Sequence, residues 1–136
     1  SDVLVVAQSM TASQATEQNI RDGCEFGPVL IINGEVNQGV YSGNSGYNPR
    51  TAIGQRADGA VIFVCADGRQ AGSIGATYKD IIDIMQEYGA VNACNMDGGS
   101  STIMYYRDTT GTVNRINSYS VLQKEPRRMP DFWMVK

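Results

Sequence analysis

The chain has 136 residues, of which 42% are hydrophobic and 18% are charged, with a formal net charge of −3. This balance excludes a disordered chain and predicts one globular domain with a real core, and the net acidity argues against a nucleic-acid-binding surface. The longest apolar run, residues 60–66, is too short to span a membrane, and no basic stretch leads into an apolar one at the start, as a targeting signal would.

The first third of the chain predicts two strands and one helix. A short apolar strand is expected at residues 3–7. A helix is expected over residues 11–22, because Thr11 and Gln14 have the spacing of a capping box. Residues 29–32 form a continuous apolar run before an Asn-Gly turn, which predicts a buried strand.

The middle of the chain contains the clearest periodic pattern. Residues 35–47 are rich in Gly, Asn and Ser, with too few apolar residues to pack, and predict a surface loop. Residues 48–55 and 60–66 flank an Ala-Asp-Gly turn, which predicts a β-hairpin. Apolar residues then recur at helical spacing over residues 77–88, behind a second capping box, and predict an amphipathic helix.

The last third predicts strands around a tight turn. A strand at residues 91–96 runs into the Asp-Gly-Gly turn, a strand at 102–106 leaves it, and further strands are expected at 113–117 and 132–135. Together these elements predict an α+β fold in a single domain spanning residues 1–136. Its expected architecture is a mixed, mostly antiparallel sheet with two helices packed on it.

The sequence contains no histidine. This excludes Ser-His-Asp and Cys-His catalysis and histidine-based zinc sites, so proton transfer would fall to Asp, Glu, Tyr, Lys or Cys. Cys24, Cys65 and Cys94 have no paired spacing; buried thiols are the favoured interpretation of Cys65 and Cys94, and one disulfide stays open. We expect no cofactor and no metal site.

Polar residues gather in clusters at the predicted strand ends and turns. The clusters are Arg50-Thr51, Asp67-Gly68-Arg69, the run from Asn95 to Ser100, and Arg127 near the C-terminus. Strand ends collect ligand groups from distant parts of a chain, so we expect these clusters to form one site with two carboxylates, guanidinium groups and backbone N–H donors. Such a site fits an anionic substrate whose bond is broken with carboxylate help. Taken singly, each cluster also has a plain structural interpretation, as a turn, a strand start or a solvated charge.

The clusters resemble the motifs of the phosphodiester glycosidase family. This family includes the lysosomal uncovering enzyme, N-acetylglucosamine-1-phosphodiester α-N-acetylglucosaminidase, and many bacterial relatives. The resemblance rests on residues 48–54, 67–69, 92–101 and 126–127, in the order and spacing of the family, and it is strongest to the bacterial branch. One departure is Ser100, which stands where the family usually has the third glycine of an Asp-Gly-Gly-Gly-Ser motif.

The resemblance implies hydrolysis of a sugar-1-phosphodiester, which releases the sugar from a phosphomonoester. In that reaction we expect Asp97 to act as nucleophile or base and Asp67 as orienter or second carboxylate, with the exchanged roles left open. Guanidinium groups and the glycine-turn backbone would stabilise the departing phosphate. The expected substrate-binding residues are Arg50, Thr51, Arg69, Asn95, Gly98, Gly99, Ser100 and Arg127.

The alternative function is a non-catalytic envelope module that binds an anionic glycan with the same groups. A metal-dependent phosphodiesterase is disfavoured, because the sequence offers neither histidine nor a close carboxylate cluster. Family members carry an earlier segment with a further strand, so we expect the chain to be the C-terminal part of a larger domain. The resemblance implies an extracellular or envelope location in exopolysaccharide or envelope-glycan processing. An exposed edge at residues 3–7 would favour a homodimer or association with the missing segment.

Overall fold

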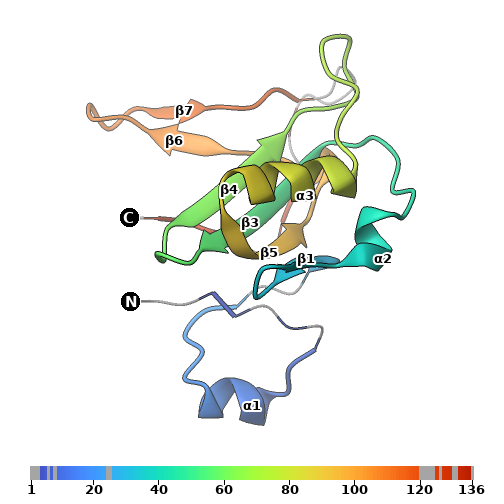
Figure 1. Ribbon diagram of the computed structural model, residues 1–136. Coiled ribbons are helices and arrows are strands. Elements are labelled where there is room, and N and C mark those ends of the chain that lie inside the picture. The colour runs from blue at the N-terminus through green and yellow to red at the C-terminus, as the bar shows by residue number, and fades with distance from the viewer. Residues whose placement is uncertain are drawn as a thin grey trace.

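The computed structural model describes residues 4–5, 7, 9–23, 26–119, 125, 127–129 and 132–135. At its centre lies a five-stranded antiparallel sheet in the order β2-β1-β5-β3-β4 (Figure 1). The strands are β1 Val29–Ile32, β2 Glu35–Val36, β3 Arg50–Arg56, β4 Val61–Ala66 and β5 Ala90–Met96. A second sheet pairs β6 Tyr105–Arg107 with β7 Val113–Arg115. The expected α+β class is confirmed.

Strand β3 occupies the position that builds the site, because it pairs with both β4 and β5. Arg50 lies opposite Ala66 of β4, and Thr51 lies opposite Met96 of β5. The start of β3 therefore lies beside the ends of its two neighbours. The predicted hairpin is confirmed: its turn closes with a hydrogen bond of 2.9 Å from Arg56 N to Ala60 O.

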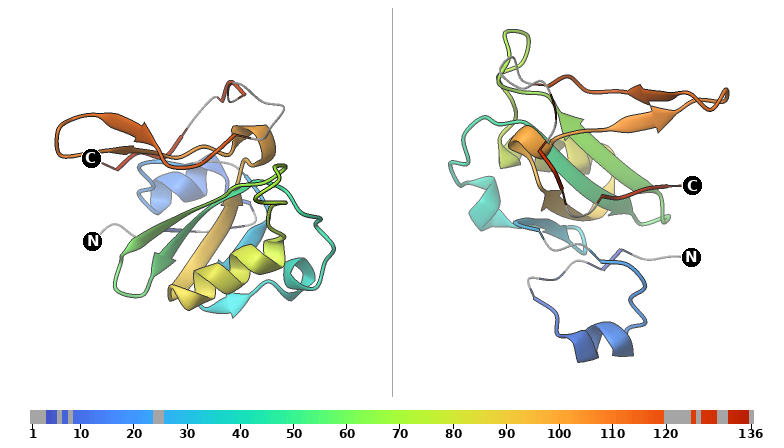
Figure 2. Two further views of the ribbon diagram at one scale, coloured as in Figure 1. Left: turned by 90° about the horizontal axis from the view of Figure 1, so that it is seen from above. Right: turned by 180° about the vertical axis from the view of Figure 1, so that it is seen from behind.

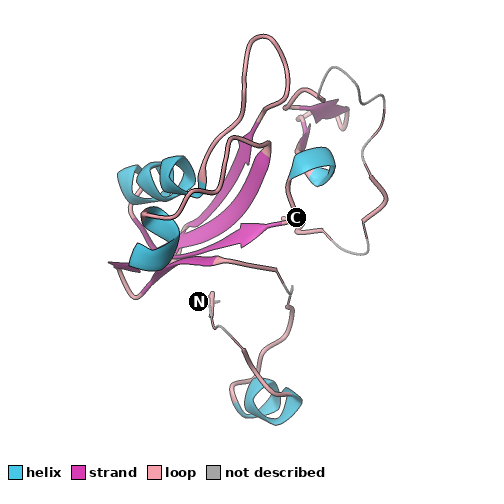
Figure 3. Cartoon of the chain, turned by 90° about the vertical axis from the view of Figure 1, so that its right-hand side faces the viewer, coloured by secondary structure: helices cyan, strands magenta, loops and turns pink. Residues whose placement is uncertain are grey.

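Helix α3, Tyr78–Glu87, covers one face of the large sheet (Figure 3). Its Thr77 cap and the Thr77–Asp80 capping box form as predicted. Ile81, Ile82 and Met85 are fully buried. They belong to a core cluster that includes Ala52 and Ala93 of the sheet. The amphipathic pattern thus faces the sheet as its spacing predicts.

The predicted loop at residues 35–47 is wrong in its first part. It contains β2 and a one-turn helix, α2 Gln38–Tyr41, which lies beside α3. Asn37 caps α2 by accepting a hydrogen bond from Val40 N, and its amide also donates to Val29 O at 3.0 Å. Val36, Val40 and Tyr41 pack against the core. Few apolar residues suffice here because one side chain ties the helix to the sheet.

The expected helix at residues 11–22 is shorter than predicted. Helix α1, Ala12–Glu17, begins at the expected capping box but ends early, and Asn19 beyond it has a left-handed φ of 53°. No residue of α1 is buried, and the helix lies apart from the large sheet (Figures 1 and 2). Consequently the second helix packed with α3 is α2, which the sequence did not predict.

The strands predicted near the two ends of the chain are not found in the described residues. Val3 and Val6 lie outside the described residues, and the described part of the segment 3–7 is not in a strand. The strand predicted at 132–135 is wrong, since Phe132 and Val135 are 79% and 75% exposed and no strand forms there. Among the described residues, no helix is both long and apolar enough to cross a membrane.

Candidate functional site

The structure brings parts of the predicted clusters together at one end of the large sheet. Pro49 O accepts a hydrogen bond of 2.8 Å from Gly99 N, which joins the β3 start to the turn after β5. Thr51 Oγ1 donates to Thr102 Oγ1 at 3.3 Å, a second link between the same segments. Arg69, after β4, lies with its guanidinium over the same turn. The antiparallel pairing of β3 with β4 and β5 produces this convergence.

Asp97 forms an ion pair with Arg127, which comes from 30 residues further along the chain. The arginine is fixed at two more points: its Nε donates to Ser101 Oγ at 2.9 Å, and its backbone N donates to Ser100 O at 3.1 Å. The Asp97 side chain remains 30% exposed and that of Arg127 58% exposed. The pair therefore places a carboxylate and a guanidinium side by side, both open to a ligand.

The Gly98-Gly99 turn needs its glycines for contact with Pro49. A Cβ on Gly98 would lie 2.8 Å from Pro49 O, closer than ordinary van der Waals contact allows. Gly99 has a φ of 58°, in the left-handed region that side chains rarely adopt. The expected free N–H donors are reduced by one, because Gly99 N donates to Pro49 O instead of to a ligand.

Asp67 and Arg69 leave the end of β4 in different directions. Both carboxylate oxygens of Asp67 accept from Ser118 N, at 2.9 and 3.1 Å, so Asp67 joins the loop after β7 to the site. Arg69 has a left-handed φ of 58°, and its Nη2 donates to Asn48 Oδ1 at 2.8 Å. A methyl group on Gly99 would come within 3.5 Å of that Nη2. The exposed Arg69 guanidinium is thus aimed at the glycine turn.

Arg50 is placed on the opposite face of the sheet from Thr51. Its side chain is buried: Nε donates to Ala76 O at 3.1 Å, and Nη2 donates to Ser45 O and Gly46 O at 2.9 and 3.1 Å. The guanidinium carbon lies 4.0 Å from the centre of the Tyr78 ring. In this arrangement Arg50 holds the loop before β3 against the start of α3 instead of joining the other site residues.

Asn95 also stands apart from the group. It is 2% exposed, and its Nδ2 donates to Gly27 O at 2.8 Å and to Met96 O at 2.9 Å. Its Oδ1 is buried and has no hydrogen-bond partner within the described part of the chain. Two of the expected substrate-binding side chains, Arg50 and Asn95, are therefore buried in this structure.

The structure adds five residues to the site that were not predicted from the sequence. Asn117, which is buried, donates from Nδ2 to Thr102 O at 3.0 Å and accepts from Met104 N at 2.8 Å. Asn48 and Ser101 lie inside the recognised motifs, and their polar side chains were a usable signal. Asn117 ends the strand predicted at residues 113–117 and Ser118 follows it, but no sequence motif connects either residue to the site, so only the fold reveals them. The additional residues are Asn48, Ser101, Thr102, Asn117 and Ser118.

The cysteines near the site are free thiols. Cys65 lies opposite Thr51, and burial, aided by the negative charge of Asp67, raises the pKa of its thiol to about 12. Burial also raises the pKa of the Cys94 thiol. Cys24 lies outside the described residues. Both described thiols are protonated near neutral pH and are poor nucleophiles.

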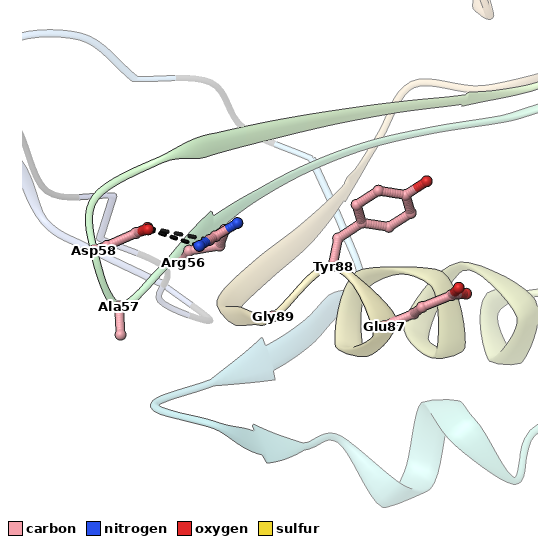
Figure 4. Close-up of a pocket in the computed structure, with 6 residues that line it drawn as sticks. All are labelled: Arg56, Ala57, Asp58, Glu87, Tyr88 and Gly89. Carbon is pink, nitrogen blue, oxygen red and sulfur yellow. Dashed lines mark hydrogen bonds and ion pairs between the residues drawn. The ribbon is translucent and has the colours of Figure 1, made fainter.

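A surface hollow lies at the other end of β3 and β4, away from this site (Figure 4). It is lined by Arg56, Ala57, Asp58, Glu87, Tyr88 and Gly89. Arg56 is already paired there with Asp58 at 2.7 Å. Within the described ranges, no three side chains of His, Cys, Asp or Glu gather closely enough to hold a metal ion.

Comparison with known proteins matches the phosphodiester glycosidase family to residues 1–136. The chain is 42% identical over 55 residues to the SPbeta prophage-derived uncharacterized protein YomE of Bacillus subtilis (strain 168), covering 40% of the chain and 8% of YomE. It is 36% identical to a hypothetical protein from Synechocystis of known crystal structure, with a TM-score of 0.46, covering 57% of the chain and 15% of that protein. The chain therefore spans a small part of the length of both relatives. Because the family match covers every residue, the chain belongs to the phosphodiester glycosidase family.

Proposed function

We propose that the chain forms the site of a hydrolase that cleaves a sugar-1-phosphodiester, as in an N-acetylglucosamine-1-phosphodiester, and releases the sugar from a phosphomonoester. Family membership supports a glycosidase-type hydrolase in general. The observation that carries the finer proposal is the open ion pair of Asp97 and Arg127 beside the Gly98-Gly99 turn. An open carboxylate next to guanidinium groups suits a substrate with an anomeric carbon on one side and a phosphate on the other.

Asp97 is the group we assign to the anomeric carbon. As a base, it takes a proton from the water whose oxygen bonds to that carbon; as a nucleophile, it bonds to the carbon itself and water displaces it afterwards. In both cases the bond from carbon to phosphate oxygen breaks, and its electron pair leaves with the phosphate. A phosphate is a good leaving group, so this step depends more on charge stabilisation than on a general acid.

Arg127 and Arg69 supply that charge stabilisation in the proposal. Both guanidinium groups reach the glycine turn from different segments, and both are exposed. An arriving phosphate would take over hydrogen bonds that Arg127 now gives to Asp97, which leaves the carboxylate free for the sugar. Binding and activation are then coupled through one arginine.

Asp67 and Arg50, two further expected residues, are assigned positioning roles. Asp67 holds the loop of Ser118 at the site through both carboxylate oxygens. Arg50 fixes the segment before β3 through carbonyl groups. We also propose a substrate among envelope glycans or exopolysaccharides, met outside the cytoplasm; the resemblance to the bacterial branch supports this location.

The test is release of free sugar from an α-linked N-acetylglucosamine-1-phosphodiester by the chain and by its Asp97→Asn variant. We expect a loss of at least about 100-fold in the variant, because the group that acts on the anomeric carbon is removed. Asp58→Asn is the matched control, since Asp58 is an exposed carboxylate paired with an arginine at the far end of the sheet. Equal activity of Asp97→Asn and wild type would overturn the assignment.

One observation favours a binding module as the second candidate function. Asp97 and Asp67 both already have partners, Arg127 and Ser118, as carboxylates with a structural role do. A binder would show a higher melting temperature with a sugar-1-phosphodiester present and no release of sugar over time. An enzyme releases sugar, and the release disappears in Asp97→Asn.

A further inference from the structure

Strands β6 and β7 form a two-stranded ribbon that projects from the body of the molecule (Figures 1 and 2). Every residue of both strands is exposed. An isolated two-stranded ribbon is marginally stable in water, so an exposed one that is held in place invites a functional explanation. We call residues 105–115 the arm.

One face of the arm combines aromatic and cationic side chains. Tyr105 lies opposite Arg115, and Arg107 lies opposite Val113. Residues that face each other across strands, and those two apart along a strand, share a face. The four side chains Tyr105, Arg107, Val113 and Arg115 therefore line one side, which we call the arm face.

Tyr119 extends the arm face at its base. The Arg115 guanidinium carbon lies 3.9 Å from the centre of the Tyr119 ring, within the range of a cation–π interaction. The hydroxyl groups of Tyr119 and Tyr105 are 3.4 Å apart. These contacts pre-organise two rings and a guanidinium before any ligand arrives.

The charge of the arm face contrasts with that of the chain. The chain has a net charge of −3, yet the arm face carries two arginines. Among the described residues, neither Arg107 nor Arg115 forms an ion pair with a carboxylate. The acidic residue of the arm, Asp108, is occupied at the tip by Thr110 and Thr112. Within the arm the cationic face is thus available to an anion, while Glu125 adds a negative charge near Tyr119 at the base.

The base of the arm is bound to the candidate site. Ile116 N donates to Met104 O at 2.9 Å, and the buried Asn117 amide ties Met104 and Thr102 together. The next residue, Ser118, donates to Asp67. The arm is therefore anchored in the same segments that form the candidate site.

We propose that the arm face binds an extended anionic glycan, a chain of sugars joined by phosphodiester bonds, beyond the bond that the site cleaves. Tyrosine rings pack against the apolar faces of sugar rings, and arginines bind phosphate oxygens in a bidentate manner. This inference rests on the proposed function and deepens it: the substrate is a polymer, and the arm is its second point of attachment.

The experiment compares binding and cleavage of two probes. One is an oligomer of about ten phosphodiester-linked sugars, and the other is the single sugar-1-phosphodiester. The variant is Arg107→Gln with Arg115→Gln, and the control is Arg56→Gln, an exposed arginine at the far end of the sheet. We expect the double variant to bind the oligomer at least about tenfold more weakly at low salt, since two charge-assisted contacts are lost. Cleavage of the single unit should stay within about twofold, because the arm lies beyond the reacting bond.

The two proposals fail in different ways. If wild type releases no sugar but binds the oligomer, and only the double variant loses that binding, the arm stands without the hydrolase. If the double variant binds the oligomer as wild type does, or if Arg56→Gln weakens binding equally, the arm inference is overturned. Equal affinity for a neutral glucan of the same length would also overturn it, as would an arm that only mediates self-association in sedimentation. Circular dichroism of the double variant and of Arg56→Gln checks that both proteins remain folded.

Discussion

Arg69 has an unfavourable backbone conformation that lowers stability, and its guanidinium lies at the candidate site. Its left-handed φ of 58° is unfavourable for any residue with a side chain, at a cost of roughly 1–2 kcal/mol. We predict that Arg69→Gly keeps or raises the free energy of unfolding, by up to about 1 kcal/mol, while sugar release or ligand affinity falls about 100-fold. Urea unfolding and the sugar-release assay measure the two quantities. A variant that is both less stable and fully active would show that the strained position serves the fold alone.

Asn48 is the residue that holds the Arg69 guanidinium. Its Oδ1 accepts from Nη2 at 2.8 Å. We predict that Asn48→Ala raises KM for a phosphodiester substrate by about tenfold, with a smaller effect on kcat, because the guanidinium loses its fixed position rather than its charge. Asn48→Asp, which retains an acceptor oxygen, should restore part of the loss. An unchanged KM in Asn48→Ala would mean that Arg69 does not need this partner.

Cys65 makes the stability of the folded protein depend on pH in the alkaline range. Burial, with the charge of Asp67, raises the pKa of its thiol from an ordinary value near 9.0 to about 12. The folded protein therefore holds this proton more tightly than the unfolded chain does, and stability is lost as pH rises from about 9 to about 12. Urea unfolding of Cys65→Ser across that range should show a shallower loss than wild type. Parallel curves would mean that Cys65 contributes nothing to the dependence.

At the scale of elements, helix α3 depends on its N-terminal cap. Thr77 N and Thr77 Oγ1 donate to Asp80 Oδ2, both at 2.8 Å, and these hydrogen bonds lower the pKa of Asp80. Because the lowered pKa belongs to the folded state, the contribution is present above about pH 4 and is lost as pH falls through the folded pKa. We predict that Asp80→Asn costs about 1 kcal/mol at pH 7 and that the difference from wild type shrinks in acid. Chemical unfolding at pH 7 and pH 3 tests this, and an undiminished difference at pH 3 would contradict it.

The elements that the sequence predicted well have local signals. Helix α3 has a capping box and a continuous amphipathic pattern, and the β3–β4 hairpin has its turn between two apolar strands. Helix α2 has neither: the Asn37 cap and the apolar side chains of Val40 and Tyr41 hold it to the core. The error at residues 132–135 has the opposite cause, since an apolar run alone does not make a strand without a neighbour to pair with.

The same contrast holds for the site. The sequence predicted which segments meet, because in an antiparallel sheet the start of β3 lies beside the ends of β4 and β5. The error lies in direction: Arg50 and Thr51 are neighbours in β3, and successive side chains in a strand point to opposite faces, so both could not enter one site. The contribution of Ser118 could not be predicted, because its link to Asp67 spans 51 residues of chain and depends on the path of the arm.

At the scale of the whole molecule, the two faces of the large sheet are unequally covered. Ile82 of α3 is completely buried against one face, whereas Phe63 of β4 lies beside Ile53 on the other face and is 37% exposed. Removing a fully buried aliphatic side chain costs about 2–5 kcal/mol, and the loss decreases with exposure. We predict that Ile82→Ala lowers the free energy of unfolding by about 3 kcal/mol and Phe63→Ala by clearly less, despite the larger side chain removed. Urea unfolding of both variants decides between two arrangements of the core. Equal losses would mean that both faces of the sheet contribute equally to the core. A smaller loss for Phe63→Ala would mean that the α3 face contains the main core, which supports the ends of β3 and β5 that form the site.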